Sequence, residues 1–391
     1  MSREAVVVAA ARTPFGRLGG ALAQVPAVDL GARVIREVVA RSALEPGEVD
    51  QVIMGTVIAA GVGQVPARQA ALRAGLPPSV SAFTVNKVCA SALKAVNLGA
   101  LLIKAGEADV VVAGGMESMS RAPYLLADQR FGARYGDRTA VDSIIRDGLC
   151  CPVDGVLMGV HGSEVAADLG VTREEQDAWA YRSQMRYRDA RDAGWFAEEI
   201  VSMPVNGSAV ERDEQPRADT TPEKLAALRG VFGPDSSVTA GNAPGMNDGA
   251  TAVVLMSADR AAALGLAPLG HWLAYGESAA EHPYLATVPA LAIEAAMRKT
   301  RGEVDTGTLA LVEINEAFAA VAITSTRMLE VDPGIVNVKG GAVAIGHPIG
   351  ASGARILMTL LYELRRRGGG YGAAGICSGI AQGEATLVRV D

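Results

Sequence analysis

The stretch Cys89–Lys94, CASALK, begins an apolar run with helical spacing, and a second version of it stands at Gly350–Arg355, GASGAR. The two starts are 350 − 89 = 261 positions apart. Each motif is followed by a turn, Ala113–Gly115 or Ala374–Ile376, that starts 23 positions after the motif's first alanine (113 − 90 = 23 and 374 − 351 = 23). This spacing predicts a helix-to-strand unit that occurs twice in the chain.

Other segments repeat at nearly the same offset. The apolar runs Val49–Met54 and Leu309–Ile314 both predict strands, and the residues that follow them are 315 − 55 = 260 positions apart. Gly249–Val254 also matches Gly383–Val388 as a closing strand, but this pair is only 383 − 249 = 134 positions apart, so the first copy has been interrupted before its closing strand. Small-residue helix starts recur by chance in many α/β proteins, but four matching segments in the same order favour a duplicated fold.

Strands and helices alternate around both copies. Apolar runs predict strands at Ala5–Ala11 and Ala108–Ala113, and helical spacing marks Ala27–Ala40 and Cys89–Ala105. This alternation favours an α/β fold whose sheets are covered on both faces. A duplicated fold would relate the copies by a pseudo-dyad and place their turns at the same end.

The first copy is interrupted before its closing strand. The interruption contains a charged helical stretch at Trp179–Arg191 and a polar stretch at Asn206–Thr221. We expect three units: an N-terminal half (residues 1–119 and 240–268), an inserted loop domain (120–239) and a C-terminal half (269–391). The inserted domain should fold over the face that carries the turns.

Composition excludes several classes of protein. The 391 residues fit two or three domains, and 49% hydrophobic residues describe a well-buried chain. A net charge of −7 argues against nucleic-acid binding. The run Ala5–Ala11 is too short for a membrane span and lacks a basic leader, and no stretch reaches the ~18 apolar residues that a span needs. We expect neither a nucleic acid nor a membrane as a partner.

The four cysteines are too few for a disulfide framework, so we expect reduced thiols in a cytoplasmic protein. Cys150 and Cys151 are adjacent, and no CxxC or HExxH spacing occurs, so we expect no metal site. We interpret this pair as structural, and His161, His271 and His282 as structural or exposed.

Cys89 begins the first predicted helix, where unpaired N–H groups would favour a thiolate and lower the thiol pKa. The alternative is a buried cysteine that packs as a small apolar residue. His347 lies among glycines and precedes Pro348, so its imidazole should stand in a rigid turn that a ligand can approach. Because the pseudo-dyad would make it face Cys89, His347 is the candidate base.

Cys377 follows the last buried strand of its copy, just before Gly379, although a packed thiol is again the alternative. Asn315 ends the matching strand, where it could orient a water or simply form a turn. Two thiols and one imidazole suit acyl transfer through a thioester: one thiol attacks, His347 takes its proton, and the other thiol moves a proton on or off carbon. N–H groups at Cys89 and Gly379 would stabilise an oxyanion.

Motifs throughout the chain resemble those of the thiolase family. They are ARTPFG (Ala11–Gly16), VNKVCAS (Val85–Ser91), GGMESMS (Gly114–Ser120), NEAFA (Asn315–Ala319), GHPIGASG (Gly346–Gly353) and CSG (Cys377–Gly379). The resemblance covers essentially the whole chain. It implies two βαβαβαββ halves in a five-layered α-β-α-β-α core. It also implies a homodimer or homotetramer that uses CoA thioesters as substrates and needs no metal or other cofactor.

The resemblance assigns roles to five residues. Cys89 would carry the acyl group. His347 would activate Cys89 and, with a water held by Asn315, bind the thioester oxygen of the partner acyl-CoA. Cys377 would be the acid and base for the α-carbon. The N–H groups of Cys89 and Gly379 would form the second oxyanion hole.

The resemblance also implies contacts to CoA, mainly from the inserted segment. The matching positions are Arg217 at the nucleotide end, Leu149 and Met158 along the pantetheine, and Ala243, Pro244, Ala317 and Phe318 near the thioester. Some positions depart from the family pattern. Pro244 replaces a serine that often bonds pantetheine, Leu157 replaces a histidine, and Ile380-Ala381 replaces glycines. These departures leave the acyl-chain length open.

Three other functions are weaker interpretations. A decarboxylating ketoacyl synthase has a related fold, but it uses a second histidine or an asparagine where this chain has Cys377. A Cys–His hydrolase leaves Cys377 and the insertion unexplained, and a non-enzymatic acyl-CoA-binding protein would not need the two thiols and the imidazole. We favour reversible thiolysis of 3-ketoacyl-CoA, or condensation of two acetyl-CoA, through acyl-Cys89 in fatty acid metabolism.

Overall fold

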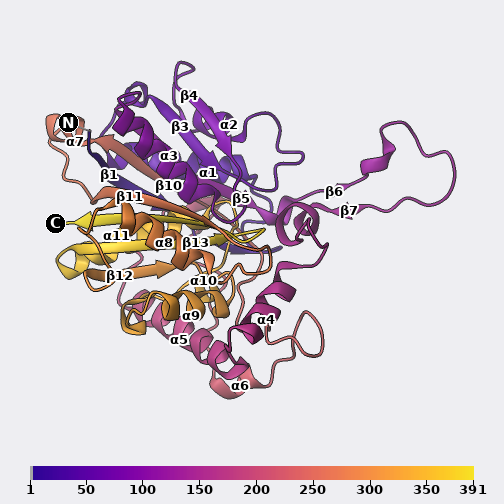
Figure 1. Cartoon of the computed structure of the whole chain (residues 1–391). Helices are drawn as coiled ribbons and strands as arrows, with labels where there is room; N and C mark the ends of the chain where they lie inside the picture. Colours follow the sequence, from indigo (N-terminus) through magenta and orange to yellow (C-terminus); the bar gives the residue numbers. More distant parts are fainter. Residues whose placement is uncertain (1–2) are drawn as a thin grey trace.

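The N-terminal half forms a sheet of five main strands and one two-residue strand, with helices on both faces, in the computed structural model, which describes residues 3–391 (Figure 1). Its elements are β1 (Ala5–Arg12), β2 (Gly16–Arg17), α1 (Ala27–Arg41), β3 (Gln51–Gly55), α2 (Pro66–Ala74), β4 (Ser81–Val85), α3 (Ser91–Ala105), β5 (Val110–Ser118), β10 (Asn247–Ser257) and α7 (Ala258–Ala263). The strand order is β1-β10-β5-β3-β4, with β3 parallel to β4 and β5. β10 runs antiparallel to β1 and β5.

The C-terminal half repeats this plan. Its elements are β11 (Gly270–Ala279), α8 (Val288–Lys299), β12 (Leu309–Ile314), α9 (Ala319–Met328), α10 (Ala342–Ile345), α11 (Ser352–Arg367), β13 (Gly370–Ser378) and β14 (Gln382–Val390). β12 and β13 are parallel, and β14 runs antiparallel to β13 and β11. β10 and β14 therefore take equivalent places, which confirms the predicted match of the two closing strands.

The second half differs from the predicted plan at its third strand, which is reduced to one bridge between Val312 and Val336. The next residue explains why. The side chain of Asn337 accepts from the N–H of Ile314 at 2.8 Å and donates to the carbonyl of Ile314 at 2.8 Å. Because this amide takes the place of a backbone pair, the ladder stops there.

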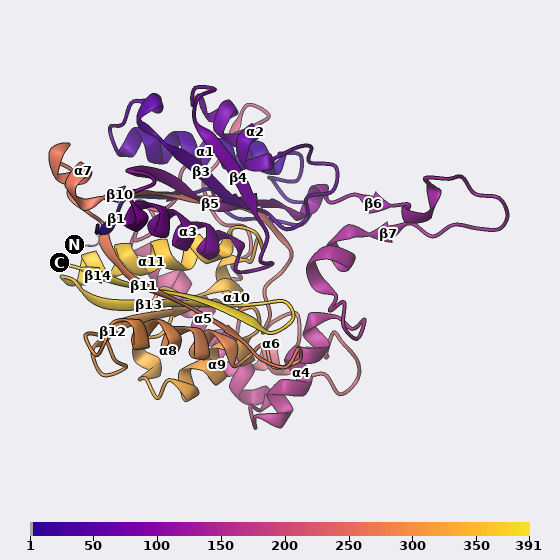
Figure 2. The ribbon, with the colours of Figure 1, turned by 45° about the horizontal axis from the view of Figure 1, so that its top comes forward.

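Helices and sheets stack in five layers, as predicted. α1 and α2 cover the outer face of the N-terminal sheet, and α8 and α9 cover the outer face of the C-terminal sheet. α3 and α11 lie side by side between the sheets (Figure 2), where one apolar cluster joins residues of both helices. The sheets meet at one seam, where Ala5–Val7 of β1 pairs with Gly270–Trp272 of β11.

The middle layer explains one wrong expectation about hydropathy. Val88–Ala105, which contains α3, has the length and mean hydropathy (1.5) of a membrane-spanning helix, whereas we expected no such stretch. In the fold this helix packs on a sheet on one side and on α11 on the other. Burial within the middle layer is therefore sufficient to explain its apolar composition.

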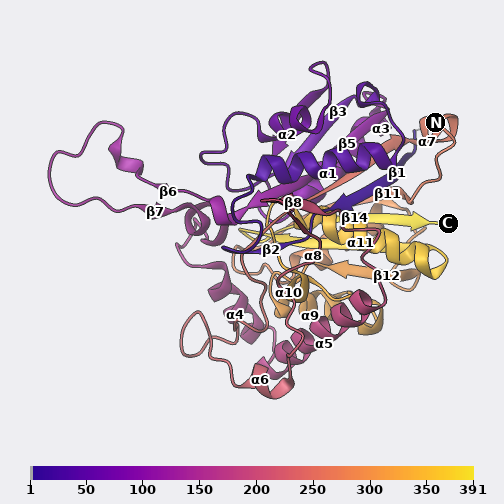
Figure 3. The same ribbon diagram turned by 180° about the vertical axis from the view of Figure 1, so that it is seen from behind.

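The inserted segment leaves the N-terminal half after β5 and returns at β10. It contains β6 (Tyr124–Leu125), β7 (Val141–Asp142), a π-helical turn (Ile144–Leu149), α4 (Met158–Asp168), α5 (Arg173–Asp192), β8 (Met203–Val205), β9 (Ser208–Val210) and α6 (Pro222–Ala226). β6 and β7 form the base of an arm that projects from the body, while α4 and α5 pack on α9 (Figure 3). α5 confirms the predicted charged helix; the domain boundaries stay a prediction.

Candidate active site

Cys89 lies in the turn between β4 and α3. Val88, just before it, has a φ of 46°, which is unusual for a β-branched residue. The N–H of Val88 donates to the side chain of Asn86 at 3.0 Å. The hydroxyl of Ser91 accepts from the N–H of Lys87 at 2.8 Å and donates to the carbonyl of Val88 at 2.6 Å. These hydrogen bonds hold the strained turn that presents Cys89.

The predicted low pKa of Cys89 is wrong. α3 begins at Ser91, so Cys89 stands before the helix rather than at its first residue. Burial raises the pKa of the Cys89 thiol to about 12, and the charge of Glu117 also raises it, against a smaller lowering by a backbone hydrogen bond. A helix start can be read from sequence, whereas this burial comes from tertiary packing. The thiol therefore stays protonated until a base removes its proton.

His347 is held in one tautomer by its neighbours. Its backbone N–H donates to the side chain of Asn247 at 2.8 Å. Its Nδ1 lies 2.6 Å from Oγ of Ser352, whose hydroxyl donates to the carbonyl of Pro348 at 2.8 Å. Because that hydroxyl has one proton, we assign the ring proton to Nδ1, which donates to Ser352. Nε2 then keeps its lone pair.

The free nitrogen of His347 can accept a proton. Burial lowers the pKa of His347 to about 3, and the nearby charge of Arg355 acts in the same direction, so the imidazole is neutral near pH 7. Nδ2 of Asn315 lies 3.4 Å from Nε2 of His347. The imidazole has the charge state and the tautomer of a general base.

Cys377 is the second-to-last residue of β13, within the strand it was predicted to follow, and is buried, with 1% of its surface exposed. Burial raises the pKa of its thiol well above the usual value, and the neighbouring Cys89 raises it further. The hydroxyl of Ser378 donates to the carbonyl of Lys87 at 2.6 Å, which ties the end of β13 to the turn of Cys89. The two thiols, from different halves of the chain, are therefore held beside each other.

One cavity of about 380 Å³ is lined by Cys89, His347 and Cys377 together. The predicted site residues that also line it are Gly379, Leu149, Met158, Ala243, Pro244, Ala317 and Phe318. Most of the other walls are apolar. The pseudo-dyad thus brings together the three groups that the sequence placed on separate turns, in a cavity whose walls suit an acyl chain or a pantetheine arm.

Two predicted residues lie outside this lining. Asn315 is buried, with its Nδ2 near Nε2 of His347, and its Oδ1 has no hydrogen-bond partner among residues 3–391. Arg217 is exposed, and its Nη1 donates at 2.8 Å to the carbonyl of Ala240, a residue of the cavity wall. Arg217 therefore stands beside the cavity, where its charge is open to a solvent-exposed anion.

The residues that depart from the family pattern line two different cavities. Pro244 and Leu157 line the cavity of the two thiols. Ile380 instead lines a neighbouring cavity of about 490 Å³. Ile380 and Ala381 have φ values of 60° and 43°, in the left-handed region where glycine is the unstrained residue. This geometry explains why glycine fits the hairpin after Cys377.

The sequence did not reveal three positioning residues: Ser352, Asn247 and Glu117. The first two hold His347, as described above. The buried carboxylate of Glu117 accepts from the N–H groups of Val57 at 3.0 Å, Ile58 at 3.2 Å and Gly350 at 3.0 Å, so it links loops of both halves. Ser352 lies in the motif Gly346–Gly353 and Glu117 in the motif Gly114–Ser120. Membership of these motifs is the one feature of the sequence that could have indicated a role for them.

Comparisons with known proteins agree with this geometry. Residues 5–259 match the model of the family described as "Thiolase, N-terminal domain", and residues 266–390 match "Thiolase, C-terminal domain". An acetyl-CoA acetyltransferase of Pseudomonas aeruginosa is 48% identical over 393 residues, which cover 99% of this chain and 100% of that protein. One from Cupriavidus necator is 46% identical over 391 residues, 99% of each chain.

A probable acetyl-CoA acetyltransferase of Escherichia coli is 45% identical over 396 residues, and the match covers the whole of both chains. The family models thus account for both halves, including the insertion, and the relatives match from end to end. On these grounds the chain belongs to the thiolase family of acyltransferases.

Proposed function

We propose that the protein is an acyl-CoA C-acyltransferase that works through an acyl-Cys89 thioester. It catalyses reversible thiolysis of 3-ketoacyl-CoA, or condensation of two acetyl-CoA to acetoacetyl-CoA. The observation that carries the proposal is the single cavity lined by Cys89, His347 and Cys377. The names of the relatives, which are acetyl-CoA acetyltransferases, favour an acetyl group as the acyl unit.

The first half of thiolysis forms the acyl-enzyme. Nε2 of His347 takes the proton of the Cys89 thiol, and the sulfur attacks the keto carbon. The bond between that carbon and the α-carbon breaks, and its electron pair goes to the α-carbon. The thiol of Cys377 protonates this carbon, so acetyl-CoA leaves. His347 is now an imidazolium and Cys377 a thiolate.

The second half returns every proton. The thiolate of Cys377 takes the proton of the incoming CoA thiol, whose sulfur attacks the acyl-Cys89 thioester. The Cys89 sulfur leaves and recovers its proton from His347. The raised pKa of both thiols and the lowered pKa of the imidazole leave the thiols protonated and the imidazole neutral near pH 7, which are the states from which this cycle starts.

The same arrangement supports CoA as the carrier of the acyl group. Leu149, Met158, Ala243 and Phe318 give the pantetheine an apolar wall, and exposed Arg217 is free to meet the nucleotide end. This cycle of acyl transfer balances without a metal or redox cofactor. Residues of the chain supply each proton transfer.

A homodimer or homotetramer in the cytoplasm completes the proposal. β4 is the edge strand of the N-terminal sheet, so its outer edge is open to a second copy. The arm between β6 and β7 exposes Phe131 (95%) and Tyr135 (94%), which suits contact with another subunit. Light scattering after size exclusion measures the assembly, and a monomer at micromolar concentration would contradict it.

Trapping the intermediate tests the function. The protein is incubated with acetyl-CoA and its intact mass is measured. We expect one acetyl group on Cys89 that is absent from Cys89→Ala and present in the matched control Cys150→Ala. An adduct that survives Cys89→Ala would overturn the nucleophile. Decarboxylation of a malonyl thioester would instead indicate a ketoacyl synthase.

A second experiment separates the roles of the thiols. Cys377→Ala should still take up the acetyl group but should fail to exchange the α-protons of acetyl-CoA with deuterium; retained exchange would remove Cys377 from its role. Values of kcat/KM with CoA and 3-ketoacyl-CoA substrates of increasing chain length then define the acyl preference. We expect the highest value with acetoacetyl-CoA.

A further inference from the structure

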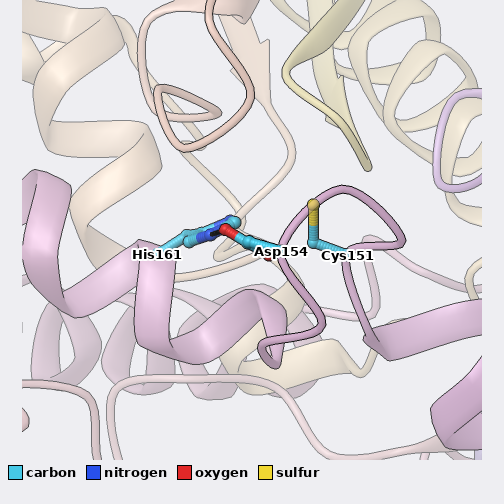
Figure 4. A group of neighbouring side chains, drawn as sticks. All are labelled: Cys151, Asp154 and His161. Atoms are coloured by element: carbon cyan, nitrogen blue, oxygen red, sulfur yellow. Dashed lines mark hydrogen bonds and ion pairs between the residues drawn. The ribbon is translucent and has the colours of Figure 1, made fainter.

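Three potential metal ligands gather beside the active-site cavity, at a place that the proposed reaction does not use. Cys151 and Asp154 lie on the turn before α4, and His161 lies on α4 itself. A ligating atom of each lies within 4.8 Å of the other two, and among residues 3–391 this is the one such group of three or more. Figure 4 shows the three side chains beside one another.

A second histidine completes the set. Nε2 of His282, from the loop between β11 and α8, lies 3.1 Å from Oδ2 of Asp154. The same oxygen is 2.6 Å from Nε2 of His161, and the two imidazole centroids are 5.5 Å apart. Two imidazole nitrogens from different segments thus converge on one carboxylate oxygen, with the thiol of Cys151 nearby.

One nitrogen of this cluster has no hydrogen-bond partner in the part of the protein that the structure describes. His161 is 2% exposed, and its Nδ1 has no hydrogen-bond partner among residues 3–391. The ring contacts Asp154 through Nε2, so an ion bound at Nε2 would leave Nδ1 as it is, and the convergence of the ligating atoms is what indicates a metal. Asp154 is already oriented, because its Oδ1 accepts from the N–H of Val156 at 3.2 Å while Oδ2 faces the histidines. Such support is typical of metal ligands.

We propose that Cys151, Asp154, His161 and His282 bind a divalent transition-metal ion of the zinc class. One thiolate, one carboxylate and two neutral imidazoles form a four-ligand set that balances the charge of the ion. Bonds of about 2.0–2.3 Å in a tetrahedron separate the ligating atoms by about 3.3–3.6 Å. The observed separations of 2.6 and 3.1 Å therefore need to open by less than about 1 Å.

The expected role of the ion is structural. It would join the inserted segment, through Cys151, Asp154 and His161, to the C-terminal half, through His282. The flanking residues Leu157 and Leu285 line the cavity of the two thiols, so the ion would fix a wall of that cavity. The sequence predicted no metal site because Cys-x2-Asp-x6-His with a distant histidine matches neither the CxxC nor the HExxH spacing.

Cobalt binding tests the site directly. The protein is prepared without a histidine tag, in a Cys89→Ala, Cys377→Ala background that removes the active-site thiols, and is treated with a chelator. Co²⁺ is then titrated while the visible d–d bands and the thiolate-to-cobalt charge-transfer band are recorded. We expect one equivalent to bind with both signals, and Zn²⁺ to displace it. Absence of stoichiometric binding would overturn the proposal.

Matched variants locate the ion. Cys151→Ser should lose the charge-transfer band, whereas Cys150→Ser, its neighbour, should keep it. His282→Ala, at a partly exposed position, should weaken binding by at least about 100-fold, because loss of even a ligand's supporting partner costs about 10–100-fold. His271→Ala is its control. Unchanged binding in both Cys151→Ser and His282→Ala would sink the assignment. None of these outcomes bears on acetylation of Cys89.

Discussion

Ser91 and Ser352 occupy equivalent places in the two copies, 352 − 91 = 261 positions apart, as the first residues of α3 and α11. Both are fully buried, and each hydroxyl donates to a carbonyl of the preceding turn. They differ in what they accept. Ser91 accepts from the backbone of Lys87, whereas Ser352 accepts from the ring of His347. One copy uses the serine to fold a turn, and the other uses it to orient a base.

The copies also differ where they touch. Gly115 of copy one corresponds to Ile376 of copy two, because 376 − 115 = 261. A Cβ added to Gly115 would lie 1.9 Å from the carbonyl oxygen of Gly350. Ile376 has room for a full side chain in the core of the middle layer. Glycine is therefore required at this point of copy one but not at the matching point of copy two.

Substitution at the contact between Gly115 and Gly350 should have the largest effect on the free energy of unfolding. Gly115→Ala would force its Cβ against the backbone of Gly350, whose N–H is already held by Glu117. We expect a loss of about 3 kcal/mol in the free energy of unfolding, at the upper end of the usual cost of overpacking, because the Cβ meets backbone atoms. Gly47→Ala, where a Cβ meets nothing within 4 Å, is the control. Chemical denaturation measures the free energy of unfolding of both variants. If the two variants are equally stable, the contact between Gly115 and Gly350 has room for a Cβ.

Ser352→Ala should separate chemistry from folding. Without the hydroxyl, Nδ1 of His347 loses its partner, so Nε2 is no longer kept free of a proton. We expect the rate of Cys89 acetylation to fall about 10–100-fold, the usual effect of removing a group that orients a functional imidazole. Single-turnover mass spectrometry measures this rate. Ser352→Cys, with a weaker acceptor, should be intermediate, and a normal rate in Ser352→Ala would contradict the tautomer.

Ser91→Ala should act mainly on stability. It leaves the partly buried N–H of Lys87 without an acceptor, which costs at most about 1–3 kcal/mol. We expect acetylation to slow less than in Ser352→Ala, because no group of the base is touched. Thermal and chemical unfolding, measured beside acetylation, test this difference. A larger loss of rate than in Ser352→Ala would reverse the comparison.

The smallest effect concerns pH. The pKa of His347, about 3, lies below the working range, and that of Cys89, about 12, lies above it. The base would be lost only as pH falls through about 3, and the thiol ionises only as pH rises towards about 12. Single-turnover acetylation should therefore stay flat from about pH 5 to 9. A change of the acetylation rate near pH 7 would contradict this prediction. It would indicate that Glu117 titrates in the site, because burial raises the pKa of Glu117 to about 7.

The sequence predicted the features that depend on the internal repeat and on the periodic spacing of apolar residues. The offset of 261 placed Cys89 and His347 on turns that do meet, and apolar spacing located α1 and most strands of both sheets. It could not predict the pKa of Cys89, because burial depends on packing between distant layers. Nor could it predict the lost third strand of copy two, where the side chain of Asn337 replaces a backbone pair.

Short-range motifs also concealed long-range partners. His161 and His282 are 282 − 161 = 121 positions apart, and neither has a distinctive neighbourhood in the sequence. Only the fold brings both to Asp154. Ser352, by contrast, lies inside a recognisable motif. That motif already accounts for Ser352 as the start of a helix, so it gives no sign of a bond to His347. Its bond to His347 depends on the direction of one side chain.

The middle layer has a consequence for how the chain unfolds. α3 and α11 share one apolar cluster, so neither half can expose its inner helix without uncovering the other. Opening should therefore be a single cooperative event for both halves, and their amides should have a common slowest class in hydrogen exchange. The arm between β6 and β7 stands outside this cluster and should exchange freely. The two duplicated halves of this chain should therefore fold and unfold together as one unit.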